Sequence, residues 1–204
     1  MRRLILLSTL LAMGGGMLSC GPSTTLKNSW RDPSVTGPMQ FGKVLALMVD
    51  KDGATRRSVE DQMVQRITAR GRTQAVAAYT ILSEADLQDK EHARQVVEQA
   101  GVDGAVVLRV AAVDKQTTYV PGTYPQPYYN FYGYNSYAWP MAYDPGYIQT
   151  DTIVDIETLI YSVKDAKLIW SGTTETFNPS STSEILEGVA AAVSAELLKQ
   201  GLIK

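Results

Sequence analysis

The stretch KVLALMV, from Lys43 to Val49, decides the fold, because six apolar residues follow its lysine without a polar break. A strand buried on both faces has such a continuous apolar run, and such strands are typical of parallel sheets covered by helices. A second run of this kind, AVVLRVAAV, spans Ala105 to Val113. The two runs predict an α/β domain with both strands inside its sheet.

The residues between these runs predict two helices and a further strand. Thr55 is expected to cap a helix that ends at Arg70, before Gly71. A strand is expected from Gln74 to Leu82 and a second helix from Asp89 to Ala100. Strand–helix–strand–helix–strand order implies parallel strands joined by right-handed crossovers. The apolar stripe expected on the first helix is Val59, Met63, Val64 and Ile67.

The C-terminal third predicts an antiparallel hairpin followed by a helix. Thr152 to Val163 alternates apolar and polar residues, and Leu168 to Phe177 returns after a turn, so one face of the hairpin is expected to be wetter. Ser181 and Glu184 form a capping box for the last helix, and Gly201 ends it in a Schellman cap. Its expected stripe is Leu186, Val189, Ala190, Val193 and Leu197.

The predicted fold is therefore a βαβαβ parallel core, extended by an antiparallel hairpin, with a C-terminal helix packed on the sheet. Residues 43–204 are expected to form this single α/β domain. Residues 20–42 form a tether and an N-terminal segment, in which Leu26 to Trp30 predicts a brief strand.

The N-terminus has the features of a signal peptide over residues 1–19. Arg2 and Arg3 precede an apolar stretch from Leu4 to Met13, which is shorter than the ~20 residues that a membrane-spanning helix needs. The following Met17-Leu18-Ser19-Cys20 resembles the bacterial lipobox, in which the cysteine is lipidated and becomes the first residue of the mature protein. Met17 and Leu18 depart from the commonest lipobox residues.

Cys20 is the single cysteine of the chain, so no internal disulfide can occupy it. Lipidation explains an unpaired thiol in an exported protein; the alternative is a secretory peptide followed by an incidental cysteine. By resemblance to the enterobacterial sorting rule, Gly21 in place of an aspartate implies the outer membrane. The expected location is the periplasmic side of that membrane, with palmitate or a similar acyl chain on Cys20.

A Tyr/Pro-rich insert spans residues 116–150 between the third and fourth expected strands. It holds nine of the eleven tyrosines and five of the nine prolines, but its one charged residue is Asp144. Tyrosine offers an apolar face and a hydroxyl at low entropic cost, which suits binding surfaces. Three interpretations stay open: a loop that packs on itself, a recognition surface for a protein or glycan, or membrane contact. The candidate binding residues are Tyr128, Tyr129, Phe131, Tyr132, Tyr134, Tyr137 and Trp139.

No motif in the sequence predicts catalysis, a cofactor or a metal site. The single histidine, His92, is expected to be a solvated helix residue, and no Gly-x-Ser-x-Gly elbow accompanies it. Asp50 and Asp52 are expected to form a turn. Arg56 and Arg57 either bind an anionic group or are solvated, and solvation is favoured. Nucleic acid is not an expected partner, because the net charge is −2 and no basic run occurs.

Several segments resemble a family of uncharacterised bacterial lipoproteins. They are Ser29-Trp30-Arg31-Asp32-Pro33, Phe41-Gly42-Lys43-Val44-Leu45, Ala78-Tyr79-Thr80-Ile81-Leu82 and Gly101-Val102-Asp103-Gly104-Ala105-Val106-Val107. The resemblance brings no activity and no catalytic residues. The order of elements is more distantly similar to periplasmic modules of the LpoB, CsgG and TolB N-terminal type, which bind or assemble proteins and are not enzymes.

The expected function is thus that of a membrane-anchored, non-enzymatic binding or assembly protein of the cell envelope. Its expected partners are the membrane, through lipid on Cys20, and an envelope protein or glycan. The alternative is an envelope hydrolase or transferase that uses His92, or Asp50 and Asp52.

Overall fold

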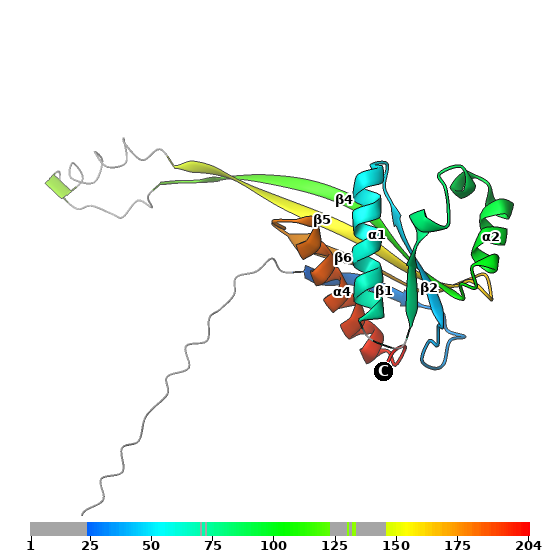
Figure 1. Ribbon diagram of the computed structural model, residues 1–204. Helices are drawn as coiled ribbons and strands as arrows, with labels where there is room; N and C mark the ends of the chain where they lie inside the picture. Colours follow the sequence, from blue (N-terminus) through cyan, green and yellow to red (C-terminus); the bar gives the residue numbers. More distant parts are fainter. Residues whose placement is uncertain (1–23, 70, 72, 123–129, 131, 134–145) are drawn as a thin grey trace, which may run out of the picture.

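The computed structural model describes residues 24–69, 71, 73–122, 130, 132–133 and 146–204. They form a mixed six-stranded sheet in the order β1-β6-β5-β4-β2-β3, with helices packed on it (Figure 1). The elements along the chain are β1 (Thr24–Arg31), β2 (Lys43–Val49), α1 (Gly53–Thr68), β3 (Gln74–Ala77), η1 (Ala78–Thr80), η2 (Asp86–Gln88), α2 (Lys90–Gln99), β4 (Gly104–Val120), β5 (Tyr147–Ser162), β6 (Lys167–Phe177) and α4 (Thr182–Lys199).

The predicted α/β fold is confirmed. β2 pairs in parallel with both β3 and β4, and β5 and β6 extend that core as an antiparallel hairpin. The brief N-terminal strand is also present. As β1, it lies antiparallel to β6 at the opposite edge of the sheet from β3.

Alternate residues of β2 belong to two apolar clusters on opposite faces of the sheet. Ala46 and Met48 belong to the larger cluster, which α1 and α4 cover. Leu45 belongs to the smaller cluster, which α2 covers. The side chain of Trp170 on β6 is fully buried in the larger cluster. Helices on both faces of β2 explain why its sequence is apolar throughout.

The face of β4, β5 and β6 turned away from α4 is the wetter one, as predicted. Arg109 pairs with Glu157 across β4 and β5 at 2.7 Å. Lys27 of β1 contacts Asp155 at 3.0 Å and Glu175 at 3.2 Å, and these hydrogen bonds raise the pKa of its ammonium. On the α4 side of β5, Val154, Ile156, Thr158 and Ile160 are all buried.

Two local predictions were wrong. The strand expected from Gln74 to Leu82 ends at Ala77, where the chain turns into η1. Helix α1 begins at Gly53, earlier than expected. Its N-cap is Asp52, whose side chain accepts the amide N–H of Thr55. The hydrogen bond from the Thr55 hydroxyl, followed by this backbone contact, lowers the pKa of Asp52.

Both ends of α4 follow the sequence closely. The Ser181 hydroxyl accepts the Glu184 amide at 3.2 Å, whereas the Glu184 carboxylate accepts the Ser180 amide at 2.7 Å, one residue earlier than a standard capping box. At the other end, Leu202 N–H donates to Leu197 O at 2.8 Å, and Gly201 has a positive φ of 68°. This is the predicted Schellman cap.

Two of the segments that carry the lipoprotein resemblance, Phe41–Leu45 and Gly101–Val107, meet at one end of the sheet. Asp103 accepts the amide N–H groups of Gly42 at 2.8 Å and Lys43 at 3.0 Å, which ties the starts of β2 and β4 together. A Cβ on Gly104 would lie 2.7 Å from the ring of Phe41, so a larger residue does not fit there. These residues therefore have structural roles.

Asp32 fixes the chain that follows β1. Its carboxylate contacts Lys167 Nζ at 2.6 Å and accepts the Ser34 amide at 2.7 Å. The hydrogen bond from Lys167, followed by those from Ser34, lowers the pKa of Asp32 to about 2. The stabilisation from this carboxylate is present above its ordinary pKa of 3.8 and is lost as the pH falls toward 2.

Candidate functional site

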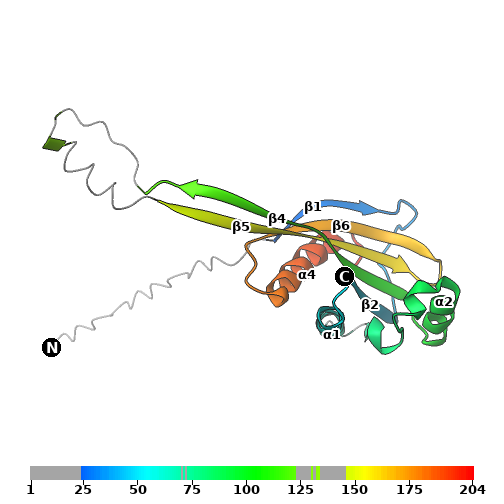
Figure 2. The same ribbon diagram turned by 90° about the horizontal axis from the view of Figure 1, so that it is seen from above.

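A long two-stranded arm projects from the sheet (Figures 1 and 2). β4 and β5 pair from Gly104↔Ser162 to Val120↔Tyr147. β6 accompanies β5 only as far as Phe177, opposite Ile153. Beyond that point, residues 115–120 and 147–152 pair only with each other among the described residues; we call them the arm.

The arm shortens the connection that the sequence predicts. Residues 116–120 and 147–150 were expected to belong to an irregular insert, but they continue β4 and β5. Threonine and tyrosine favour strands. The prediction gave more weight to the Tyr/Pro-rich composition of the whole insert and so missed these strand residues.

Asn178 secures the base of the arm where β6 ends. Its amide nitrogen and side-chain oxygen bond the backbone of Thr152 from both sides, each at 2.7 Å. Its side-chain nitrogen donates to Asp151 at 2.7 Å. Hydrogen bonds from Gln149 and then Asn178 lower the pKa of Asp151. Asn178 has a positive φ of 47°, which asparagine tolerates well.

The arm has a polar shaft and an apolar end. The shaft consists of residues 115–118 and 149–152, which are Lys, Gln, Thr and Asp. At the end, Tyr119 is 61% exposed, Tyr147 60% and Ile148 70%. Gly146 has a positive φ of 78°, and a Cβ there would lie 2.4 Å from the carbonyl oxygen of Val120. A glycine is therefore required where the chain enters β5.

Of the candidate binding residues, the structure places one. Tyr132 is 82% exposed. The others, and the proposed lipidation site Cys20, lie outside the described residues: Tyr128, Tyr129, Phe131, Tyr134, Tyr137 and Trp139.

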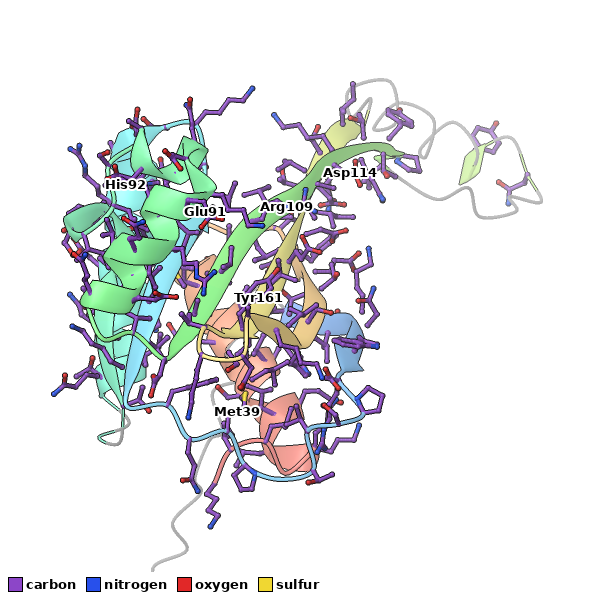
Figure 3. All side chains as sticks on the ribbon, turned by 90° about the vertical axis from the view of Figure 1, so that its right-hand side faces the viewer. Met39, Glu91, His92, Arg109, Asp114 and Tyr161 are labelled. Carbon is purple, nitrogen blue, oxygen red and sulfur yellow. The ribbon has the colours of Figure 1, made fainter. Side chains whose placement is uncertain are left out.

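His92 lies on the outer side of α2 (Figure 3). Its Nε2 is 3.1 Å from Asp86 Oδ1, and its side chain is 54% exposed. The Ser83 hydroxyl accepts the amide N–H of Asp86 rather than contacting the imidazole. The Asp86 carboxylate accepts the Ser83 amide N–H at 2.7 Å, so its contacts in this part of the chain are the imidazole and a backbone amide, whereas in a catalytic triad the imidazole lies between the carboxylate and the hydroxyl. Hydrogen bonds from Ser83, and then the charge of His92, lower the pKa of Asp86.

Arg56 is not solvated, which corrects the favoured interpretation of the sequence. It is 8% exposed, and its Nε lies 3.5 Å from Oε1 of Glu60, which is fully buried. Arg57 is exposed, with its guanidinium 6.0 Å from the ring centroid of Tyr79. Both arginines line a hollow of about 410 Å³, whose wall also includes the carboxylate-bearing Glu84.

Glu60 is a buried polar residue that the sequence analysis missed. Its Oε1 accepts the amide N–H of Met48 at 3.1 Å, and its Oε2 accepts that of Tyr79 at 2.8 Å. β3 ends at Ala77, opposite Ala46, so beyond this point Glu60 takes the place of a neighbouring strand for β2. The i, i+4 spacing of Arg56 and Glu60 was the available signal.

The described part of the chain contains no group of three or more His, Cys, Asp or Glu side chains placed to hold a metal ion. None of its helices is long and apolar enough to cross a membrane.

Solved structures with a similar arrangement of elements include the PelC dodecamer from Paraburkholderia phytofirmans. It is 14% identical, with a TM-score of 0.45, and the match covers 89% of this chain and 99% of that chain. Lipoprotein GNA1162 from Neisseria meningitidis is 13% identical, with a TM-score of 0.39 over 78% and 99% of the two chains. No protein-family model and no curated protein matches the chain. The likeness is one of coarse arrangement only.

Proposed function

We propose that this chain is a lipid-anchored, non-enzymatic binding or assembly protein of the bacterial cell envelope. Lipid on Cys20 holds it on the periplasmic side of the outer membrane. The observation that carries the proposal is the arm, because two paired strands extend beyond the rest of the sheet and have the exposed aromatic side chains of Tyr119 and Tyr147 at their end. The Tyr/Pro-rich residues 121–146 begin where these strands end.

The construction of the arm supports a binding role over a role in folding. Its shaft is polar, and Asn178 fixes its base to the sheet. Exposed tyrosine and isoleucine side chains at its end offer apolar area without contributing to either core cluster. Large exposed apolar groups held away from a protein body are typical of interaction sites.

The anchor gives the first expected result. Cys20→Ala removes the thiol that accepts the lipid, so the protein should remain an uncleaved precursor and incorporate no palmitate probe. The matched control is Ser23→Ala, three residues beyond the cysteine, which should be cleaved and labelled normally. Processing and gel mobility of epitope-tagged protein in cells measure both effects. Normal cleavage of the Cys20→Ala variant, together with an unlabelled wild type, would refute lipidation.

The Tyr/Pro-rich residues 121–146, which follow the arm, give the second expected result. A variant in which an Asn-Gly turn joins Val120 directly to Tyr147 keeps the paired shaft, because two residues suffice to close a hairpin. It should fold and be exported, but in a strain that lacks the gene it should not restore the wild-type phenotype. His92→Ala and Asp50→Asn should restore it fully. If His92→Ala abolished complementation at an unchanged protein level, the rival hydrolase or transferase would gain the support that the binding role lost.

A further inference from the structure

The start of β1 and the base of the arm lie at the same end of the sheet. Thr24 is paired with Thr176, Thr176 with Val154, and Val154 with Val113, so one row crosses four strands. β4 continues past this row into the arm. Figures 1 and 2 agree that β1 begins on the side of the body from which the arm projects.

The arm reaches farther than the tether. Cys20 precedes Thr24 by four residues, which span at most about 14 Å even when fully extended. Val120 follows Val113 by seven strand residues, which span about 23 Å. Measured from the same row of the sheet, the end of the arm therefore lies beyond the greatest distance at which Cys20 can lie.

The short tether restricts the orientations that the domain can take on a bilayer in which the acyl chains of Cys20 are inserted. With the arm along the bilayer normal, its end passes below the level of Cys20. With the arm parallel to the surface, the three strand spacings between Thr24 and Val113 add about 14 Å to the tether, so its end lies within about 28 Å of the bilayer. Turning the arm away would place the body between Thr24 and the bilayer. β1 alone has eight residues, about 27 Å of strand, which the tether cannot bypass.

The chemistry at the end of the arm matches the membrane interface. Tyr119, Tyr147 and Ile148 are each at least 60% exposed, and the shaft behind them is polar. Tyrosine is enriched at the level of the lipid headgroups, where its ring meets acyl chains and its hydroxyl meets water. A polar shaft suits the aqueous layer between that interface and the body.

We propose that the end of the arm, formed by Tyr119, Tyr147 and Ile148, rests in the interface of the same bilayer that carries the lipid on Cys20. This inference rests on the proposed lipid anchor. The protein then has two contacts with one membrane, the acyl chains and the arm, and these two contacts fix the orientation of the domain on the surface.

The test uses the acylated full-length protein with one added cysteine. Cys20 is the single native cysteine and is blocked by lipid, so Ile148→Cys provides the only free thiol. The matched control is Leu198→Cys, which is 52% exposed near the end of α4. Each variant is labelled with an environment-sensitive dye and reconstituted in phosphatidylethanolamine–phosphatidylglycerol vesicles containing nitroxide-labelled lipid.

The dye at position 148 should shift to the blue and be quenched several-fold more than the dye at position 198. Equal, water-like emission at both positions on vesicle-bound, acylated protein would overturn the arm contact while leaving the anchor intact. Absence of acyl chains on Cys20, read by mass spectrometry, would overturn the anchor and the inference together. A photoreactive residue at position 148 should crosslink to lipid in cells, and a protein or glycan adduct in its place would also contradict the proposal.

Discussion

Replacing Glu60 with leucine is expected to destabilise the domain by about 3–5 kcal/mol, a large part of a typical total of ~5–15 kcal/mol. The substitution removes the acceptor for the amide N–H groups of Met48 and Tyr79 and the anionic neighbour of Arg56. Each N–H group left without an acceptor pays the full free-energy penalty of desolvation, because no hydrogen bond replaces its contact with water. The guanidinium also becomes an uncompensated buried charge. Urea unfolding of the wild type and the variant measures the difference.

Two further variants separate the hydrogen bonds from the charge. Glu60→Gln keeps the shape and one good acceptor, so its free energy of unfolding should fall between those of the wild type and Glu60→Leu. Combining Arg56→Met with Glu60→Leu removes the unpaired charge, so the double variant should lose less stability than the sum of the two single changes. A loss below ~1 kcal/mol for Glu60→Leu would mean that water or a rearranged backbone satisfies both amides.

Leu197→Ala is expected to lower the stability by ~2–5 kcal/mol, because it leaves a cavity in the larger apolar cluster. Leu197 is 6% exposed, and its carbonyl oxygen accepts the Leu202 N–H of the Schellman cap. The comparison is Tyr132→Ala, at a side chain that is 82% exposed, where a change within ~0.5 kcal/mol is expected. Thermal denaturation of both variants measures the contrast.

This contrast tests the division between a stable body and a binding element. Comparable losses at Leu197 and Tyr132 would place the aromatic segment within the folded core. The proposed binding role would then lose its main support, because a side chain needed for packing is not available to a partner.

The sequence by itself determined the elements whose signals are local. The run from Lys43 to Val49 identified β2 to the residue, because burial on both faces removes every polar position. Ser181 and Gly201 identified the ends of α4, because capping depends only on side chains and dihedral angles close in the chain. The parallel order of β2, β3 and β4 followed from the helices between them.

Tertiary structure decided what depends on residues far apart. β3 ends at Ala77 because Glu60 of α1 occupies the next place beside β2, and a helix side chain in that position leaves no sequence signal in the strand. Arg56 is buried because of the residues that pack around it, although a charged residue type predicts exposure. The arm exists because β4 and β5 pair beyond the end of β6, and the start of β1 lies at the same end of the sheet because β1 pairs with β6. Strand pairing between distant segments rests on backbone hydrogen bonds that any residue type can make, so only the folded chain brings the start of β1 and the base of the arm to the same end of the sheet.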